Sequence, residues 1–131
     1  EVSVVDAAFI QPMLHRLSER GIAVAYAGFS AGKGRLAELA ESPPEFLKLD
    51  KSLVQGLHLS ETRKKQLRDI VLACDEHGVK VIAVGVETDD EARECAALGC
   101  LAGQGAWFGG PQTLASLLEQ KLEPVQAGSR N

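Results

Sequence analysis

The sequence has no excess of basic residues and no long apolar run, and each absence excludes a class of function. Its 131 residues include 14 Lys and Arg against 18 Asp and Glu, which gives a formal net charge of −4. A protein that neutralises nucleic-acid phosphates needs a basic surface, so we expect no nucleic-acid partner. No apolar stretch approaches the roughly 20 residues that span a bilayer, so we expect no membrane segment in this chain.

Cysteines are also few, and none of them forms a CxxC pair. The three are Cys74, Cys95 and Cys100, all within segments that we predict to be helix or strand. Without closely spaced ligand pairs we predict no zinc site, and we predict no other cofactor. An odd number of thiols inside secondary structure indicates free, buried cysteines in a reducing compartment, and we therefore predict a cytoplasmic location. The chain starts at Glu1 without a methionine or a signal peptide, which fits a fragment of a longer parent.

The remaining chain is organised around residues 80–88, Lys-Val-Ile-Ala-Val-Gly-Val-Glu-Thr. Its apolar residues occupy both alternating sets of positions, a pattern typical of a parallel strand that is covered on both faces. Thr88-Asp-Asp-Glu91 has the T-x-x-E spacing of a helix capping box. A strand therefore runs directly into a helix, and Glu87 lies at the carboxyl end of the strand, where α/β proteins place their chemistry.

Helical and strand patterns alternate along the whole chain. We predict strands at 22–27, 45–50, 80–87 and just after 100, and helices from Gln11 to Gly21 and at 35–40, 60–78, 89–98 and from 111, with a turn at 53–57 and a strand end at 1–5. This order predicts an α/β fold of parallel (βα) units over residues 1–123, followed by a disordered tail at 124–131. Four units form either an open sheet or half of an eight-stranded barrel. A half barrel leaves two exposed sheet edges and an uncovered inner face, so it needs a partner or a second copy.

Several segments together resemble a known family. They are Gly21-Ile-Ala-Val-Ala, Phe29, Leu47-Lys-Leu-Asp-Lys-Ser52, Ala83-Val-Gly-Val-Glu-Thr88, Leu98-Gly-Cys and Gln104-Gly. In order and spacing they resemble the second half of the EAL-domain family, cyclic di-GMP phosphodiesterases built on a TIM-like barrel. The resemblance covers nearly the whole chain and implies the second half of such a barrel.

The chain departs from the family pattern at the residues that the family uses for catalysis. The family holds two divalent cations with carboxylates at the strand ends. Its Asp-Asp-Phe-Gly pattern matches Ala27-Gly28-Phe29-Ser30, its Glu-Gly-Val-Glu pattern matches Val84-Gly-Val-Glu87, and Leu101 replaces an aspartate. Neutral side chains do not supply the attraction that a divalent ion needs, so we predict no metal site and no phosphodiesterase activity.

Four polar residues remain at positions that the resemblance assigns to ligand binding: Lys48, Asp50, Glu87 and Gln104. Our leading interpretation is a catalytically inactive EAL-like signalling module that acts through a protein partner or through self-association by its sheet edges. The first alternative is a receptor that binds cyclic di-GMP without cleaving it. Equally, Lys48 could form a structural ion pair with Asp50 or Glu87.

The stretch Gly28-Phe-Ser-Ala-Gly32 supports a second alternative, because it matches the G-x-S-x-G elbow of serine hydrolases. Ser30 would be the nucleophile, with Asp50 and either His58 or His77 as its partners. His58 lies in a connecting segment and His77 lies at the wrong end of the following strand, so we rank this alternative last. Read as a P-loop, the stretch is one residue short and lacks the Ser or Thr that binds Mg²⁺.

Overall fold

The computed structural model describes residues 7–30 and 35–120, so the predicted strand end at 1–5 and the predicted tail lie outside the described residues. The described elements are, in chain order, helix α1 (Ala7–Glu19), strand β1 (Ala25–Phe29), helix α2 (Arg35–Glu41), strand β2 (Phe46–Leu49), helix α3 (Lys51–Val54), the 3-10 helix η1 (Leu57–Leu59), helix α4 (Glu61–Glu76), strand β3 (Lys80–Val84), helix α5 (Asp89–Ala97), strand β4 (Ala102–Gln104) and helix α6 (Leu114–Glu119). Among the described helices, none is both long enough and apolar enough to cross a bilayer.

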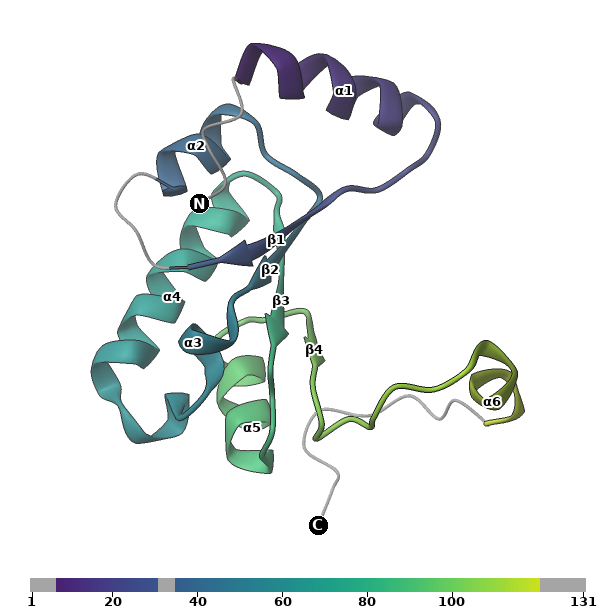
Figure 1. Ribbon diagram of the computed structural model, residues 1–131. Coiled ribbons are helices and arrows are strands. Elements are labelled where there is room, and N and C mark those ends of the chain that lie inside the picture. The colour runs from purple at the N-terminus through teal and green to yellow at the C-terminus, as the bar shows by residue number, and fades with distance from the viewer. Residues whose placement is uncertain (1–6, 31–34, 121–131) are drawn as a thin grey trace.

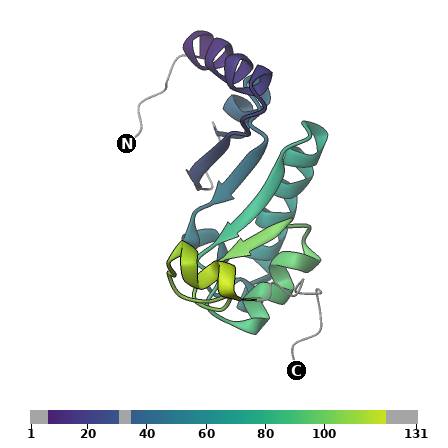
Figure 2. The ribbon, with the colours of Figure 1, turned by 90° about the vertical axis from the view of Figure 1, so that its right-hand side faces the viewer.

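The four strands form one parallel sheet in the order β1-β2-β3-β4. Helices α2 to α5 cover one face of this sheet, whereas α1 and α6 extend away from it (Figures 1 and 2). The predicted α/β fold of parallel (βα) units is therefore confirmed. We call the helix-covered side the outer face and the opposite side the inner face.

The core of the protein lies between the outer face and α4. Leu47 and Leu49 of β2 and Val81 and Ala83 of β3 are at most 1% exposed. Helix α4 buries the apolar residues predicted for its core-facing side, namely Leu67, Ile70, Val71 and Cys74. Ser60 caps this helix by accepting a hydrogen bond from the backbone N–H of Arg63 at 3.3 Å.

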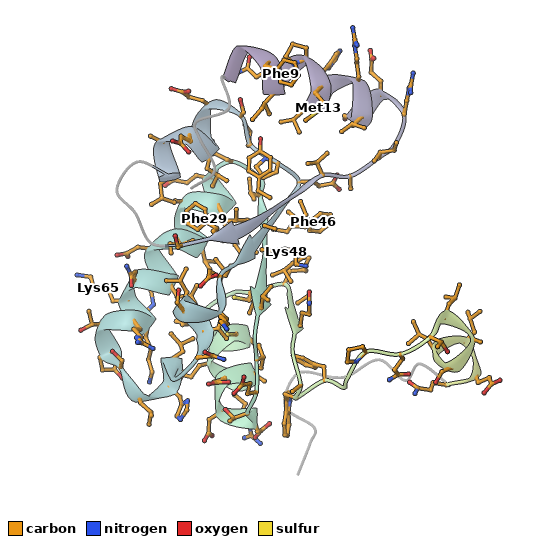
Figure 3. The ribbon with its side chains drawn as sticks, viewed as in Figure 1. Phe9, Met13, Phe29, Phe46, Lys48 and Lys65 are labelled. Atoms are coloured by element: carbon orange, nitrogen blue, oxygen red, sulfur yellow. The ribbon has the colours of Figure 1, made fainter. Side chains whose placement is uncertain are left out.

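The inner face differs from the prediction that the strand within residues 80–88 is covered on both faces, and it matches the uncovered inner face expected of a half barrel. Phe46 and Lys48 of β2 and Ile82 and Val84 of β3 are only half-buried. Figure 3 shows Phe46 and Lys48 on the side of the sheet away from α4, while Phe29 lies on the α4 side. Because side chains alternate along a strand, every second residue points to the inner face. Within residues 7–30 and 35–120, no second layer covers the side chains on this face.

The first helix is longer than predicted, because it begins at Ala7 and accommodates Pro12 in its interior. Pro12 lies early in the helix, where its missing N–H removes only one backbone bond. The predicted end is confirmed: Gly21 has a φ of 69°, and the N–H groups of Gly21 and Ile22 donate to the carbonyls of Ser18 and Leu17. This is a Schellman motif.

Two other boundaries also differ from the prediction. Strand β3 ends at Val84 rather than at residue 87, because Gly85 turns the chain with a φ of 80°. The last helix begins at Leu114 rather than 111, where the Thr113 side chain accepts the N–H of Ser116 at 3.2 Å. Both ends follow from local backbone geometry that hydrophobic periodicity does not record.

Candidate functional site

The carboxyl ends of all four strands meet at one edge of the sheet, and the candidate site is at this edge. Here β1 is irregular: Tyr26 pairs with Leu47 but Phe29 pairs with Leu49, so β1 has an extra residue. Gly28 has a φ of 69° within the strand, which accounts for this bulge. The predicted strand at 22–27 is therefore shifted, and Gly28 and Phe29 belong to the strand rather than to the loop.

Backbone segments are packed closely at this edge. A Cβ atom added to Gly85 would lie 2.6 Å from Cβ of Lys51. The N–H of Gly85 donates to the carbonyl of Gln104 at 2.9 Å, and so does the N–H of Val86 at 3.1 Å. These contacts fix the segment after β3 against the end of β4, so the side chains that follow the two strands are held in place.

Lys48 and Gln104 lie on the same face of the sheet. Lys48 is paired in register with Ile82, which pairs with Ala102, while Gln104 pairs with Val84 in the next row. Alternation along the strands places these residues on the inner face, with Lys48 and Gln104 separated by β3. Among the ion pairs of the described residues, none includes Lys48, so the predicted ion pair with Asp50 or Glu87 is not formed here.

Asp50 caps helix α3. Its Oδ1 accepts the backbone N–H of Ser52 at 2.9 Å, and its own N–H donates to the Phe29 carbonyl at 2.7 Å. Hydrogen bonds from the Ser52 side chain and backbone lower the pKa of Asp50 below its usual value. Asp50 therefore stays ionised at neutral pH, and part of its hydrogen-bonding capacity is committed to the helix.

Glu87 is exposed, and one of its oxygens is engaged. Its Oε1 accepts a hydrogen bond from Nε2 of Gln55 at 2.9 Å. The four predicted ligand-binding residues thus lie in or after strands β2, β3 and β4, but they form no direct contact with one another among the described hydrogen bonds and ion pairs.

The residue that organises this edge is Glu91, whose long-range role sequence reasoning missed. Its side chain is buried and accepts the backbone N–H groups of Gly56 and Glu87, each at 2.8 Å, and of Thr88 at 3.2 Å. Thr88 in turn accepts the N–H of Glu91, so the predicted capping box is confirmed. The T-x-x-E spacing indicated the cap, but no local signal indicated the bond to Gly56, which is distant in sequence.

The pKa of Glu91 reflects these contacts. Burial by itself raises the pKa of a carboxyl group, and the three backbone donors oppose this effect by stabilising the anion. The net result is a pKa below the ordinary value of 4.5. Glu91 therefore serves as an ionised anchor between the loop before η1 and the start of α5.

The hydrolase constellation is not assembled in the described chain. Ser30 directly follows β1 at the carboxyl edge, whereas His77 ends α4 and precedes β3, at the opposite edge. His58 belongs to η1, which packs against α4 and α5 on the outer side of the sheet. Among the described hydrogen bonds, none joins Ser30 to Asp50 or to either histidine, and Gly32 lies outside the described residues.

The carboxyl ends of the strands offer few ligands for a metal ion. Ala27 and Gly28 of β1, Val84 of β3 and Leu101 before β4 offer no side-chain oxygen, so these residues do not fit a divalent cation. Within the described ranges, no group of three or more His, Cys, Asp or Glu residues could hold a metal ion.

Comparison with known proteins gives consistent matches. The EAL domain model matches residues 1–111. The cyclic di-GMP phosphodiesterase NbdA of Pseudomonas aeruginosa is 32% identical over 108 residues, which cover 82% of this chain and 14% of NbdA. The EAL domain of Mycobacterium smegmatis DcpA superposes with a TM-score of 0.80 at 28% sequence identity. The matched region covers 88% of this chain and 52% of the DcpA chain.

A cyclic di-GMP complex of the phosphodiesterase PaMucR superposes with a TM-score of 0.75 at 27% identity, over 88% of this chain and 47% of its own. The chain thus spans about half the length of these two solved structures and a small part of NbdA.

Proposed function

Because this chain belongs to the EAL domain family, we propose that it is a catalytically inactive EAL-like module that acts by protein association. Inactivity is supported by Ala27 and Gly28 near the carboxyl end of β1 and by Val84 at that of β3, which offer no oxygen ligand for a cation. A carboxylate cluster that would clamp two metal ions in phosphodiester hydrolysis has no counterpart among the described residues. We also propose a cytoplasmic location for this association, in line with the reducing environment predicted from the free thiols.

The observation that supports association is the uncovered inner face of the sheet, which lies between two edge strands. Within the described sheet, strands β1 and β4 are both edge strands, each paired with one neighbouring strand. The apolar side chains of Phe46, Ile82 and Val84 are only half-buried between them. Unpaired parallel edges beside an apolar face are a template for pairing with another chain.

A second copy of this chain supplies a fitting partner. Since all four strands are parallel, a two-fold axis along the strand direction places β1 of one copy beside β4 of the other, twice and with parallel polarity. This pairing satisfies both edges and covers both inner faces at once. The exposed apolar side chains of α1 and α6, including Phe9 at 70% and Leu114 at 71% exposure, add further surface for such contacts.

Size-exclusion chromatography with light scattering tests the association. The expected mass is that of two chains of 14.0 kDa, decreasing toward one chain on dilution. Ala102→Lys places a charge on the edge strand β4 and should shift the mass to that of one chain. Ala97→Lys adds the same charge on an exposed position of α5 and should leave the mass unchanged. A wild-type protein that stays at the mass of one chain at all concentrations would refute the self-association.

A second candidate function is a non-hydrolysing receptor for cyclic di-GMP. It is favoured by the common face of Lys48 and Gln104, with Asp50 and Glu87 at the same edge, and by relatives whose names describe cyclic di-GMP phosphodiesterases. A cationic side chain and an amide suit a phosphate and a guanine edge.

Calorimetric titration with cyclic di-GMP, with and without Mn²⁺, separates these possibilities. The receptor predicts binding that ignores the metal and that weakens at least tenfold in Lys48→Ala and Gln104→Ala, but not in Lys65→Ala on the exposed side of α4. Binding that requires Mn²⁺, or cleavage of cyclic di-GMP to a linear dinucleotide, would contradict the proposed inactivity. No binding would leave association as the function.

A further inference from the structure

Two of the three cysteines meet where helix α5 ends. The helix ends at Ala97 with Leu98 as its C-cap, and Gly99 follows with a φ of 98°. The N–H of Cys100 donates to the carbonyl of Cys95 at 3.0 Å, and the N–H of Gly99 donates to that of Ala96 at 3.1 Å. This is a Schellman motif, and in this motif the side chains at the positions of Cys95 and Cys100 contact each other.

The two thiols influence the ionisation of one another. The Cys100 thiol donates to the Cys95 sulfur, which lowers the pKa of Cys95 in spite of its burial. The same hydrogen bond, together with burial, raises the pKa of Cys100. Cys95 is 4% exposed and Cys100 is half-buried, so Cys100 is the more accessible residue of the two.

The third cysteine has a different environment. Cys74 of α4 is fully buried, and burial raises its pKa to about 11, with a smaller contribution from Asp75. A buried, protonated thiol reacts slowly, because the thiolate is the nucleophile. Cys74 therefore provides a control within the same protein.

We propose that Cys95 and Cys100 form a peroxide-sensitive dithiol, which oxidation closes into a disulfide between the last turn of α5 and the start of β4. In the first step the Cys95 sulfur attacks one peroxide oxygen and the O–O bond breaks. This yields a sulfenic acid on Cys95 and one water. In the second step the Cys100 sulfur displaces the hydroxyl group from Cys95, forming the S–S bond and a second water. One peroxide is reduced to two waters while two thiols are oxidised.

The position of this bond links it to the proposed interface. Cys100 lies two residues before β4, which is an edge strand of the described sheet. In a reducing compartment such a bond is transient, because cellular thiols reduce it again. The pair is thus a reversible modification site next to the edge through which the protein is proposed to associate.

Trypsin makes the test direct. It releases Cys74 in peptide 69–80 and both Cys95 and Cys100 in peptide 94–121. The purified protein is treated with hydrogen peroxide, alkylated under denaturing conditions, digested and analysed by mass spectrometry. The expected product is peptide 94–121 lacking two hydrogen atoms and carrying no alkyl group, restored by dithiothreitol, with Cys74 still alkylated.

Variants make the assignment unambiguous. Cys74→Ser should oxidise like the wild type, and Cys100→Ser should accumulate a sulfenic acid on Cys95 that dimedone traps. Because Cys95→Ser changes a buried site and can impair folding, the partly exposed Cys100→Ser variant keeps the test independent of that risk. Full alkylation of all three cysteines after peroxide treatment would overturn the proposal, and so would a cross-link between peptides 69–80 and 94–121.

Discussion

The outer and inner faces of the sheet are built from the same strands but have different surroundings. On β2, Leu47 and Leu49 are at most 1% exposed beneath α4, while Phe46 and Lys48, which alternate with them, are half-buried. On β3, Val81 and Ala83 are buried, while Ile82 and Val84 are not. The strands are apolar on both sides, but the described chain supplies a covering layer on one side only.

This difference shows which part of the sequence stabilises the fold within the chain and which part is available for another surface. Alternating residues on the outer face pack against α4 and are expected to contribute to the free energy of unfolding. Alternating residues on the inner face contribute little until a partner covers them, because apolar area stabilises only when it leaves water. Mutations on the inner face that lower the free energy of unfolding more than mutations on the outer face would contradict this assignment.

The largest effect is expected at Leu47. Leu47→Ala removes a fully buried side chain and leaves a cavity, so the free energy of unfolding should fall by about 2–5 kcal/mol. Leu59→Ala is the matched control, because Leu59 is 80% exposed and its change should stay within about 0.5 kcal/mol. Urea denaturation measures both, and equal losses would contradict the assignment of the core to the outer face.

The next effect is expected at Glu91, where the two carboxylates of the carboxyl edge can be compared. Glu91→Ala leaves the backbone N–H groups of Gly56, Glu87 and Thr88 without their acceptor and should cost about 1–3 kcal/mol. Glu87→Ala removes an exposed carboxylate and should stay within about 0.5 kcal/mol. A greater loss for Glu87→Ala would contradict the anchoring role of Glu91.

The contribution of Glu91 to stability should depend on pH. The folded protein lowers the pKa of Glu91 below the ordinary 4.5 that applies to the unfolded chain. Its stabilisation is therefore fully present above that value and is lost as the pH falls through the lower, folded pKa. The stability difference between the wild type and Glu91→Gln should be constant from pH 6 upward, on the order of 1 kcal/mol, and should decrease below pH 4.5. A stability difference that increases on acidification would contradict a lowered pKa of Glu91.

A smaller effect compares two valines of one strand. Val81→Ala, on the outer face, should cost about 2 kcal/mol, and Val84→Ala, on the inner face, about 1 kcal/mol less. These measurements apply to dilute protein. At concentrations where the chains associate, the cost of Val84→Ala should increase, whereas that of Val81→Ala should not. Identical costs under both conditions would argue against an interface on the inner face.

The smallest effect on stability is expected at Lys48. Because Lys48 makes no ion pair among the described residues, Lys48→Ala should change the free energy of unfolding by less than about 0.5 kcal/mol. A clear loss of stability would mean that Lys48 supports the fold rather than a ligand or partner.

Periodicity predicted the outer half of the molecule well. The buried positions of α4, the capping box at Thr88 and the parallel sheet all follow from local apolar spacing and cap residues. Apolar spacing alone left the covering of the inner face open, because an apolar strand looks the same whether its second layer is in the chain or elsewhere. Only the half-barrel alternative predicted an uncovered inner face. The bond from Glu91 to Gly56 was missed because it joins segments that only the folded chain brings together.

The contact between Cys95 and Cys100 was not predicted, although its cause is local. Gly99 signalled the end of a helix in the sequence, but the Schellman geometry that brings the two thiols together depends on which backbone bonds close the cap. Likewise, the shift of β1 depends on the bulge at Gly28, which a count of apolar residues does not show.

The most direct test of the proposed association through the sheet edges is hydrogen–deuterium exchange measured at low and high protein concentration. If the open sheet edges are an association surface, amides of β1 and β4 should gain protection as concentration rises. Amides of β2 and β3 already lie between paired strands and should change little. Equal exchange of β1 and β4 at both concentrations would contradict the proposed interface.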